Sequence, residues 1–489
     1  MTARSGNDGE ERGQLVNGYG KTMTNTSTSN TCCIEVTRDL LIKYDRPGPR
    51  YTSYPTVPEW RDDFSGEEYR TALRKAAEAP DAPLSLYVHI PFCRKRCAYC
   101  GCNTAVPNDA DEITAYLSNV RREVERVRED LDPRRTVSQM HWGGGTPTTL
   151  ELGQIRALFG TLTAAFRIAP DAEVALEVDP RVTTSGQVEL LRELGFNRIS
   201  MGVQDLDPDV QREIGREQTE EQTRRLFDWC REAGFRGINM DLVYGLPGQH
   251  IDTWTRTIHR IIDIGPDRLA VYSFAHLPKQ LANQQAIDGS RLPTGPEKYG
   301  LFAAARCMLV EAGYRPIGMD HFAKPDDELA QALDERRLNR NFMGYTVVSA
   351  EGMIGFGVSA IGEIGGCYAQ NEKTTPEYHT RLDRERFAVA RGCILSQDDS
   401  IRRWVIRQLM CNFHLDTQQL LHRFNVTYSE YFAREEEALR EFYEQGFIDK
   451  QNGNLRILPL GQVFIRNVAM IFDAYLRKSG SHRQFSRTV

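Results

Sequence analysis

From about residue 84 onward the chain alternates between short apolar runs and longer amphipathic stretches. Six runs have the length and composition of buried strands: LSLYVHI (84–90), SQMHWG (138–143), VALEVD (174–179), RISMGV (198–203), GINMDLVYG (237–245) and RLAVYSFA (268–275). Helical spacing of apolar residues lies between them, at 112–130, 151–166, 183–194, 219–233 and 252–264. This alternation predicts an α/β fold with a parallel sheet, most simply a partial or full (β/α) barrel.

The joints from helix back to strand resemble one another. ELGFNRI, EAGFRGI and EAGYRPI place Gly195, Gly234 and Gly313 at the helix end, each followed by an aromatic residue and a strand start. A glycine at this point takes the left-handed conformation that ends a helix. The repetition supports tandem βα units.

The segments on either side of the barrel have a different character. We expect a disordered tail over 1–35, which is too polar to bury, and an ordered arm over 36–80 that contains KYDRPGPRYTSYPTVPEW. The barrel domain and its extension should cover 81–394. Amphipathic stretches such as SIRRWVIRQLMCNF then predict a mainly helical C-terminal domain over 395–489.

Composition narrows the class of protein. The 489 residues are 40% hydrophobic and 26% charged, with a formal net charge of −6, which argues against nucleic-acid binding through a general basic field. No apolar run reaches the ~18 residues of a membrane span, and the N-terminus has no apolar core of a secretory signal. We therefore expect a cytoplasmic protein in a reducing compartment. Without a heptad pattern, a monomer is the default.

Four cysteines stand within ten residues, CRKRCAYCGC, directly after the first predicted strand. A structural zinc site usually needs a second C-x2-C pair or histidines at a distance, and the polar RKR insert argues against simple burial. A redox C-x2-C pair is a further alternative. The crowded spacing C-x3-C-x2-C favours a [4Fe–4S] cluster held by three thiolates, which leaves one iron open to a small chelating ligand.

Other polar residues fall at the ends of the predicted strands. GGGTP follows the second strand, Glu177 and Asp179 end the third, Gln204 follows the fourth, and AHLP follows the sixth. Asp241 lies within the fifth strand. Because parallel barrels carry their active sites where the strands end, these residues and the cysteines are expected to form one site.

The cysteine loop after the first strand resembles that of the radical S-adenosylmethionine (SAM) superfamily. YTSYPT, YVHIPFCRKRCAYCGCN, HWGGGTPT, SMGVQD, DLVYGLPGQ, IGMDHFAKPDDEL, GVSAIG and the tail IRNVAMIFDAYLR…QFSR further resemble the oxygen-independent coproporphyrinogen III oxidase family, over about residues 40–489. One departure is Tyr99, where that family is expected to have phenylalanine; the aromatic contact is kept.

The resemblance implies a set of site residues. Cys93, Cys97 and Cys100 would ligate the cluster. A first SAM would contact Tyr87, Gly144, Glu177 and Ile361, with the neighbouring glycines allowing close backbone approach. A second SAM would contact the residues Tyr99, Gly145, Thr146, Gln204, Arg216, Asp241 and Ala275.

Plainer roles stay open for several of these side chains. Tyr87 also suits a core aromatic and Glu177 a solvated carboxylate. Arg216 and Asp241 also suit a structural ion pair at the barrel rim. Cys102 has no assigned role, because three thiolates already complete the ligand set; the related haem-chaperone branch generally lacks this cysteine.

The implied activity is the anaerobic oxidative decarboxylation of two propionates of coproporphyrinogen III to vinyl groups, giving protoporphyrinogen IX for haem biosynthesis. It would use two SAM molecules per turnover and an electron donor of flavodoxin or ferredoxin type. Candidate propionate-binding residues are Arg50, Arg340, Arg466 and Arg487. A haem-binding chaperone of the same superfamily and a non-catalytic zinc protein are the alternatives.

Overall fold

The computed structural model describes residues 34–348, 352–479 and 485–488. The tail predicted over 1–35 lies outside these ranges except for its last two residues. Within the described ranges, no helix combines the length and apolar character needed to cross a membrane.

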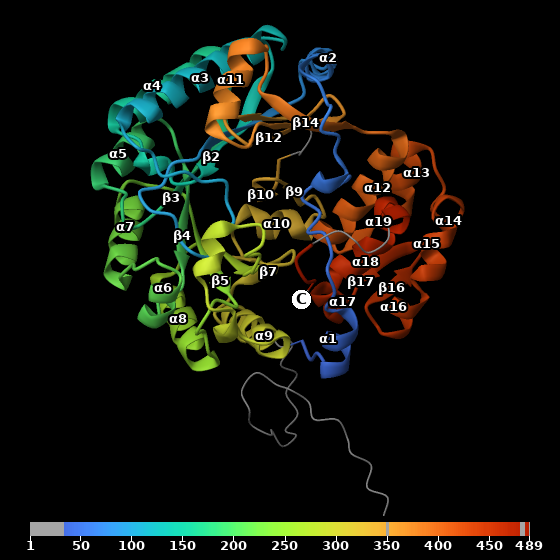
Figure 1. The fold of residues 1–489 in the computed structure, drawn as a ribbon. Helices are drawn as coiled ribbons and strands as arrows, with labels where there is room; N and C mark the ends of the chain where they lie inside the picture. The colour runs from blue at the N-terminus through green and yellow to red at the C-terminus, as the bar shows by residue number, and fades with distance from the viewer. Residues whose placement is uncertain (1–33, 349–351, 480–484, 489) are drawn as a thin grey trace, which may run out of the picture.

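A twelve-stranded sheet forms the centre of the molecule, in the order β14-β13-β12-β11-β1-β2-β3-β4-β5-β6-β8-β7. The strands from β11 through β6 are parallel neighbours, and both edges of the sheet are antiparallel. The parallel strands are β1 (Leu84–Ile90), β2 (Thr136–Gly144), β3 (Arg167–Val178), β4 (Arg198–Gln204), β5 (Gly237–Tyr244), β6 (Arg268–Ser273) and β11 (Met353–Phe356). The prediction of a partial parallel barrel is confirmed (Figure 1).

Short strands close the two edges. They are β7 (Arg315–Ile317), β8 (His321–Ala323), β12 (Ile361–Ile364), β13 (Cys367–Asn371) and β14 (Val389–Ile394). A separate hairpin consists of β9 (Asn339–Asn341) and β10 (Gly344–Thr346). None of these strands was predicted, because runs of three to six residues carry little periodicity.

The helices between the parallel strands cover the outer face of the sheet (Figure 1). They are α3 (Ala110–Glu129), α4 (Leu152–Ala165), α5 (Ser185–Glu193), α6 (Pro208–Glu213), α7 (Glu220–Glu232), α8 (Ile251–Ile264) and α9 (Gly295–Glu311). Capping boxes at Thr184 and Thr219 start α5 and α7. Gly195, Gly234 and Gly313 have φ of 99°, 84° and 91°, so the return joints have the predicted left-handed form.

The C-terminal part is mainly helical. Its helices are α12 (Gln397–Arg407), α13 (Thr417–Phe424), α14 (Tyr428–Tyr431), α15 (Ala433–Ala438), α16 (Arg440–Glu444), α17 (Pro459–Val463), α18 (Ile465–Ile471) and α19 (Ala474–Ser479). They pack on a core of their own, in which Phe447 and Phe464 stack at 4.9 Å. A small unpredicted sheet is added by β15 (His414–Leu415), β16 (Ile448–Gln451) and β17 (Asn454–Ile457).

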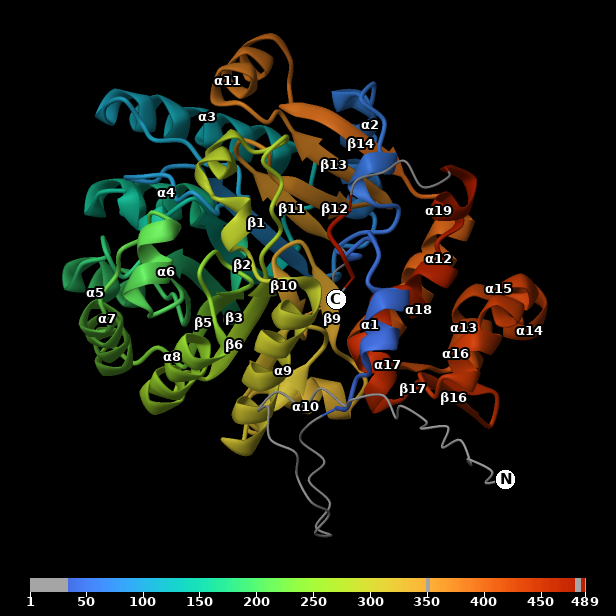
Figure 2. The same ribbon diagram turned by 60° about the horizontal axis from the view of Figure 1, so that its bottom comes forward.

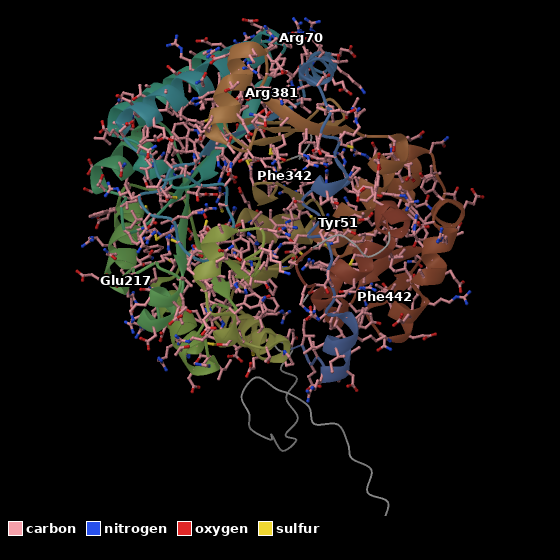
Figure 3. The ribbon with its side chains drawn as sticks, in the orientation of Figure 1. Tyr51, Arg70, Glu217, Phe342, Arg381 and Phe442 are labelled. Carbon is pink, nitrogen blue, oxygen red and sulfur yellow. The ribbon has the colours of Figure 1, made fainter. Side chains whose placement is uncertain are left out.

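The N-terminal arm connects the two parts. Its first helix, α1 (Arg38–Tyr44), lies beside the C-terminal helices (Figure 2). The Tyr51 hydroxyl donates to Asp473 at 2.9 Å, and the Tyr54 hydroxyl accepts from the amide of Ala474 at 3.1 Å. Tyr51 is labelled beside the C-terminal helices in Figure 3. The remaining helices are α2 (Gly66–Ala77), α10 (Glu328–Asp334) and α11 (Thr375–Arg384). The arm is thus an integral part of the folded structure.

Candidate active site

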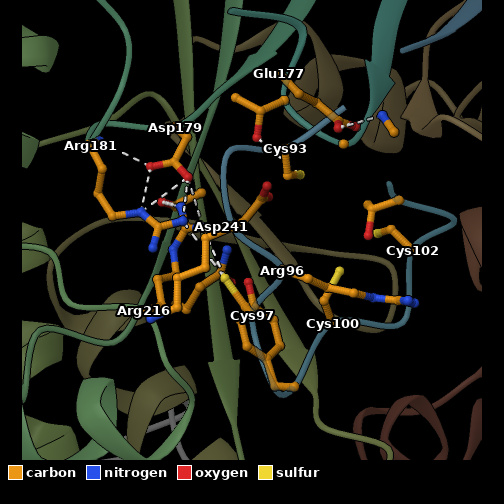
Figure 4. A pocket seen from close by; sticks show the side chains of 18 of the residues that line it. Cys93, Arg96, Cys97, Cys100, Cys102, Glu177, Asp179, Arg181, Arg216 and Asp241 are labelled. Atoms are coloured by element: carbon orange, nitrogen blue, oxygen red, sulfur yellow. Dashed lines mark hydrogen bonds and ion pairs between the residues drawn. The ribbon is translucent and has the colours of Figure 1, made fainter. Parts of the chain in front are cut away.

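A cavity of about 500 Å³ opens where the parallel strands end (Figure 4). It brings together most of the predicted site residues. They come from the cysteine loop, from β2 to β5 or the residues just after these strands, and, for Arg216, from the segment between α6 and α7. The predicted residues that line it are Cys93, Cys97, Tyr99, Cys100, Cys102, Gly144, Gly145, Thr146, Glu177, Gln204, Arg216 and Asp241. Side chains separated by up to 148 positions in the sequence thus share one space because parallel strands end at one rim.

Three predicted residues lie outside this lining. Tyr87 lies on β1, outside the cavity lining. Its ring stacks on His141 at 6.1 Å, and its hydroxyl lies 3.0 Å from Nδ1 of His89. Ala275 lines a neighbouring cavity of about 700 Å³. Ile361 begins β12 and is half-buried. The structure therefore does not place these three in the wall of the cavity.

The cysteine loop is held by backbone and side-chain bonds from neighbouring segments. The amide of Cys93 donates to the Ala105 carbonyl at 2.9 Å. Asn283 donates through Nδ2 to the carbonyls of Cys97, Ala98 and Cys100 at 3.1, 3.0 and 2.9 Å. Gln284 donates to the Tyr99 carbonyl at 2.9 Å. A single short 3₁₀ turn, Ala282–Ala286, thus fixes the loop that carries the three thiols.

Asn283→Ala should loosen this loop. The three carbonyls share the two N–H groups of this amide, and each hydrogen bond is worth ~1 kcal/mol. We therefore expect the reconstituted iron to be lost about tenfold faster under a chelator. Gln285→Ala is the matched control, because Gln285 is exposed on the same turn and bonds only the Pro278 carbonyl among the described residues. Equal rates of iron loss in the two variants would show that Asn283 does not hold the loop.

Cys97 lies in a positively charged environment. Arg181 and Arg216 approach its sulfur at 3.7 and 3.8 Å through guanidinium nitrogens. Both arginines also pair with Asp179, at 2.7 and 3.0 Å. Cationic donors of this kind stabilise a thiolate, which is the form that binds metal.

The other thiols differ in their surroundings. The Cys102 thiol hydrogen-bonds the Cys100 sulfur and lowers the pKa of Cys100 to about 6. Burial raises the pKa of Cys93, partly offset by Thr146, whose hydroxyl lies 3.5 Å away. Among the described residues, no three His, Cys, Asp or Glu side chains converge closely enough to hold a single metal ion. Thiol donors spread along one loop suit a multi-iron cluster better than one zinc ion.

Glu177 presents a carboxylate to the cavity. Its Oε1 lies 3.2 Å from Nε2 of His141, and its Oε2 accepts from the Gly144 amide at 3.0 Å. Burial would raise the pKa of Glu177, but these hydrogen bonds outweigh burial and lower it. The side chain remains 40% exposed, so it is ionised and has acceptor capacity left for a ligand.

Glycine is required beside Glu177. Gly144 has φ of 112°, and a Cβ there would lie 2.5 Å from the ring of His89. A Cβ on Gly143 would lie 2.7 Å from Glu177. The absence of side chains lets the loop backbone come close to whatever occupies the cavity.

Arg216 and Asp241 do not pair with each other. Arg216 is 7% exposed, pairs with Asp179 and donates to the Gly202 carbonyl at 2.7 Å. Its buried Nε has no hydrogen-bond partner in the described structure. Asp241 accepts only neutral donors there, from Asn239 at 2.8 Å and Ser200 at 3.2 Å. A cation and an anion that are not paired with each other therefore line the same cavity.

The arginines suggested as propionate ligands have partners inside the protein. Arg50 pairs with Asp320, and Arg340 donates to the Arg50 carbonyl at 2.5 Å. Arg466 donates to the Pro49 carbonyl at 3.0 Å, and Arg487 pairs with Asp45 at 2.5 Å. These four side chains tie the arm and the C-terminal tail to the rest of the molecule. The cavity instead has exposed cations of its own on the cysteine loop, Arg94, Lys95 and Arg96. Figure 4 labels Arg96 among the residues that line the cavity.

Comparison with known proteins identifies the class. The family model of the radical SAM superfamily matches residues 87–261, which include the end of β1, the cysteine loop and β2 to β5. The model of the HemN C-terminal domain matches residues 395–464. Together with the thiols at the end of the first barrel strand, these matches define a radical SAM protein.

Curated relatives and a solved structure define the family. The chain is 43% identical over 450 residues to oxygen-independent coproporphyrinogen III oxidase of Escherichia coli, covering 92% of this chain and 98% of that one. It is 41% identical over 460 residues to that of Synechocystis, covering 93% and 98%. The structure of coproporphyrinogen III oxidase (HemN) from Escherichia coli superposes with a TM-score of 0.85 at 43% identity, covering 89% and 98%. The chain belongs to the oxygen-independent coproporphyrinogen III oxidase family.

Proposed function

We propose that the protein converts coproporphyrinogen III to protoporphyrinogen IX without oxygen, by oxidative decarboxylation of two propionates to vinyl groups. The observation that carries this proposal is the cavity itself. Three thiols on one fixed loop share it with an ionised carboxylate, Glu177, and with the cations of the loop. Family membership supports the same activity.

The donor set fits a [4Fe–4S] cluster. Cys93, Cys97 and Cys100 would hold it, and Arg181 and Arg216 would neutralise part of the thiolate charge at Cys97. When bound, the cluster supplies the electron that cleaves SAM to methionine and the 5′-deoxyadenosyl radical. The cavity walls would hold the reactants close together and restrict the access of water.

The chain's own residues position two SAM molecules. For the first, Glu177 and the Gly144 backbone would hold the polar groups, with Tyr87 and Ile361 completing its surroundings. For the second, Arg216 would bind the carboxylate and Asp241 the amine, because the two side chains line the cavity and have opposite charges. The remaining contacts are Tyr99, Gly145, Thr146, Gln204 and Ala275. Two molecules per turnover match two propionates.

The substrate carries four carboxylates, so its recognition requires cations. We place its propionates near Arg94, Lys95 and Arg96, which are exposed at the mouth of the cavity. An electron donor of flavodoxin or ferredoxin type would reduce the cluster. A reducing cytoplasm and a monomeric chain, without nucleic-acid or membrane partners, complete the proposal.

The pH dependence of binding should identify the role of Asp241. Burial raises the pKa of Asp241 to about 6, with repulsion from Glu177 adding to the effect. Below this pH the carboxyl is protonated and cannot pair with an amine, so binding of the second SAM should weaken as pH falls through 6. The stability of the fold has the opposite pH dependence. Because the pKa of Asp241 is raised in the folded protein, its protonation stabilises the native state at low pH, and that contribution is lost as pH rises through 6.

Calorimetric titration of SAM from pH 5 to pH 8 would measure this dependence. Asp241→Asn should bind more weakly than the wild type at pH 8 and show no inflection near pH 6. An unchanged inflection in Asp241→Asn would assign the titration to another group.

The proposed activity is tested by anaerobic incubation of the reconstituted protein with a reductant, SAM and coproporphyrinogen III. Chromatography of the oxidised porphyrins should show loss of two carboxyl groups, with protoporphyrin as the product. Cleavage of SAM with the porphyrinogen left intact would reject the oxidase and favour the haem-binding chaperone.

A further inference from the structure

Gln204 has a strained backbone in the wall of the proposed active site. Its φ is 71°, and among the described residues that line the cavity it is the one residue other than glycine with a left-handed backbone. The amide of Asp205 donates to the Val203 carbonyl at 2.9 Å, which closes a γ-turn around Gln204. The pairing of β4 with β5 also shifts register at this point. Such a conformation persists only where the surrounding structure holds it.

The side chains of Gln204 and Arg216 lie against the same glycine. A Cβ on Gly202 would lie 2.9 Å from Nε2 of Gln204 and 3.1 Å from a terminal nitrogen of Arg216. Arg216 also donates to the Gly202 carbonyl at 2.7 Å. Gln204 ends β4, whereas Arg216 lies in the segment between α6 and α7. Two separate backbone segments must therefore keep a fixed relation for both side chains to line one cavity.

A buried carboxylate holds the residue that follows Gln204. Asp205 is fully buried, and its Oδ1 accepts from the Thr257 hydroxyl at 2.6 Å and from the amide of Asp207 at 2.9 Å. Its Oδ2 accepts from Nε2 of Gln249 at 2.6 Å. Thr257 lies on α8 and Gln249 just before that helix. The Asp205 side chain thus ties the end of β4 to α8.

Gln211 joins Asp205 to the segment that carries Arg216. Its Nε2 donates to the carbonyls of Asp205 and Gln218 at 2.8 and 2.6 Å. Its Oε1 accepts from the amide of Gln218 at 2.9 Å, and its own carbonyl accepts from the amide of Arg216 at 2.9 Å. This buried residue therefore fixes the segment 216–218 relative to the turn at Gln204.

Neither Asp205 nor Gln211 lines the cavity, so any effect on a ligand there must act through the residues that they hold. Buried polar networks whose members bond one another favour a single arrangement. We propose that Asp205 and Gln211 are positioning residues for the second SAM. Asp205 holds the strained turn of Gln204, and Gln211 keeps Arg216 beside it. This inference rests on the proposed function, because the second SAM is part of that proposal.

Gln211→Met tests the inference, because methionine keeps the length of the side chain and removes its hydrogen bonds. The full chain, reconstituted anaerobically, is titrated calorimetrically with SAM. The wild type should bind two equivalents. In Gln211→Met the iron content and the affinity for the first equivalent should match the wild type, and the affinity for the second should fall about tenfold. Unchanged affinity for the second equivalent, or equal weakening of both, would overturn the positioning role.

Asn412→Leu is the matched control. Asn412 is a buried amide that bonds the amide and the carbonyl of Leu338 at 3.0 and 3.1 Å, as Gln211 bonds those of Gln218. It lies outside the cavity lining. Asn412→Leu should lower the Tm and still bind both equivalents of SAM as the wild type does. If it weakens the second SAM as much as Gln211→Met does, the effect is general loss of stability and the inference fails.

Thr257→Val and Thr257→Ser test Asp205 from its other side. Valine has the shape of threonine without the hydroxyl that donates to Asp205, and serine keeps that hydroxyl. Thr257→Val should weaken the second SAM, and Thr257→Ser should restore its affinity. Equal affinities in the two variants would contradict the role of Asp205. This pair keeps the test valid if Gln211→Met fails to fold.

Crystal structures of the wild type and Gln211→Met separate this inference from the proposed function. The variant alone should show a changed φ at Gln204 or a broken bond between Arg216 and the Gly202 carbonyl, whatever number of SAM molecules binds. A wild type that binds one SAM would reject the second SAM of the proposed function, and the two structures would still decide the positioning. An identical backbone at Gln204 and Arg216 in both structures would overturn it.

Discussion

Cys97→Ala is expected to abolish iron binding and SAM cleavage together. Cys97 is the thiol that both Arg181 and Arg216 approach, so its replacement also removes the sulfur that these two cations contact. With two thiolates the loop can no longer hold a four-iron cluster, and turnover should fall on the order of a thousandfold or more. Iron content and the yield of 5′-deoxyadenosine after anaerobic reconstitution measure both effects.

Cys230→Ala is the matched control for this prediction. Cys230 is fully buried on α7, away from the cavity lining, and its replacement changes packing only. It should retain iron and SAM cleavage. A Cys97→Ala protein with wild-type iron content would show that the three-thiol assignment is wrong.

Glu177→Gln is expected to weaken SAM binding strongly while leaving the cluster in place. The carboxylate keeps its charge because hydrogen bonds from His141 and Gly144 lower its pKa, and its exposed oxygens face the cavity. Loss of a charge-assisted hydrogen bond costs ~1.5–3 kcal/mol, or about 10- to 150-fold in affinity. The KM for SAM and direct titration should show this change, with wild-type iron content.

Glu193→Gln provides the comparison for Glu177→Gln. Glu193 carries the same charge but lies on the outer helix α5, exposed and paired with Arg156. Its SAM affinity should equal that of the wild type. If Glu177→Gln also leaves SAM affinity unchanged, Glu177 serves only to order the Gly144 turn.

Strong periodicity made the barrel predictable. The first predicted strand, 84–90, coincides with β1. The helix predicted over 252–264 starts one residue after α8, which begins at Ile251. Strands such as β1 are apolar along nearly their whole length because both faces are buried, and the helices show a wide apolar stripe. The antiparallel edge strands were missed because β7 and β12 have three and four residues and gain stability from tertiary pairing.

The site could be predicted only where its chemistry requires a recognisable pattern of residues in the sequence. The cysteine spacing and the acidic residue at the end of β3 are visible without a structure, and the structure brings Glu177 and the thiols to one cavity. Asn283 carried no signal, because an asparagine in a loop has the same appearance whether it binds three carbonyls or water. The four suggested arginines illustrate the opposite problem, since residue type does not reveal that Arg466 binds the arm.

The most direct test of the account is the fate of hydrogen from the substrate. Coproporphyrinogen III carrying deuterium at the β-carbons of its propionates would be converted anaerobically, and the 5′-deoxyadenosine analysed by mass spectrometry. Direct hydrogen abstraction from this carbon predicts deuterium in the 5′-deoxyadenosine and protoporphyrinogen IX in the same reaction. Protoporphyrinogen IX formed alongside unlabelled 5′-deoxyadenosine would contradict direct hydrogen abstraction at this carbon.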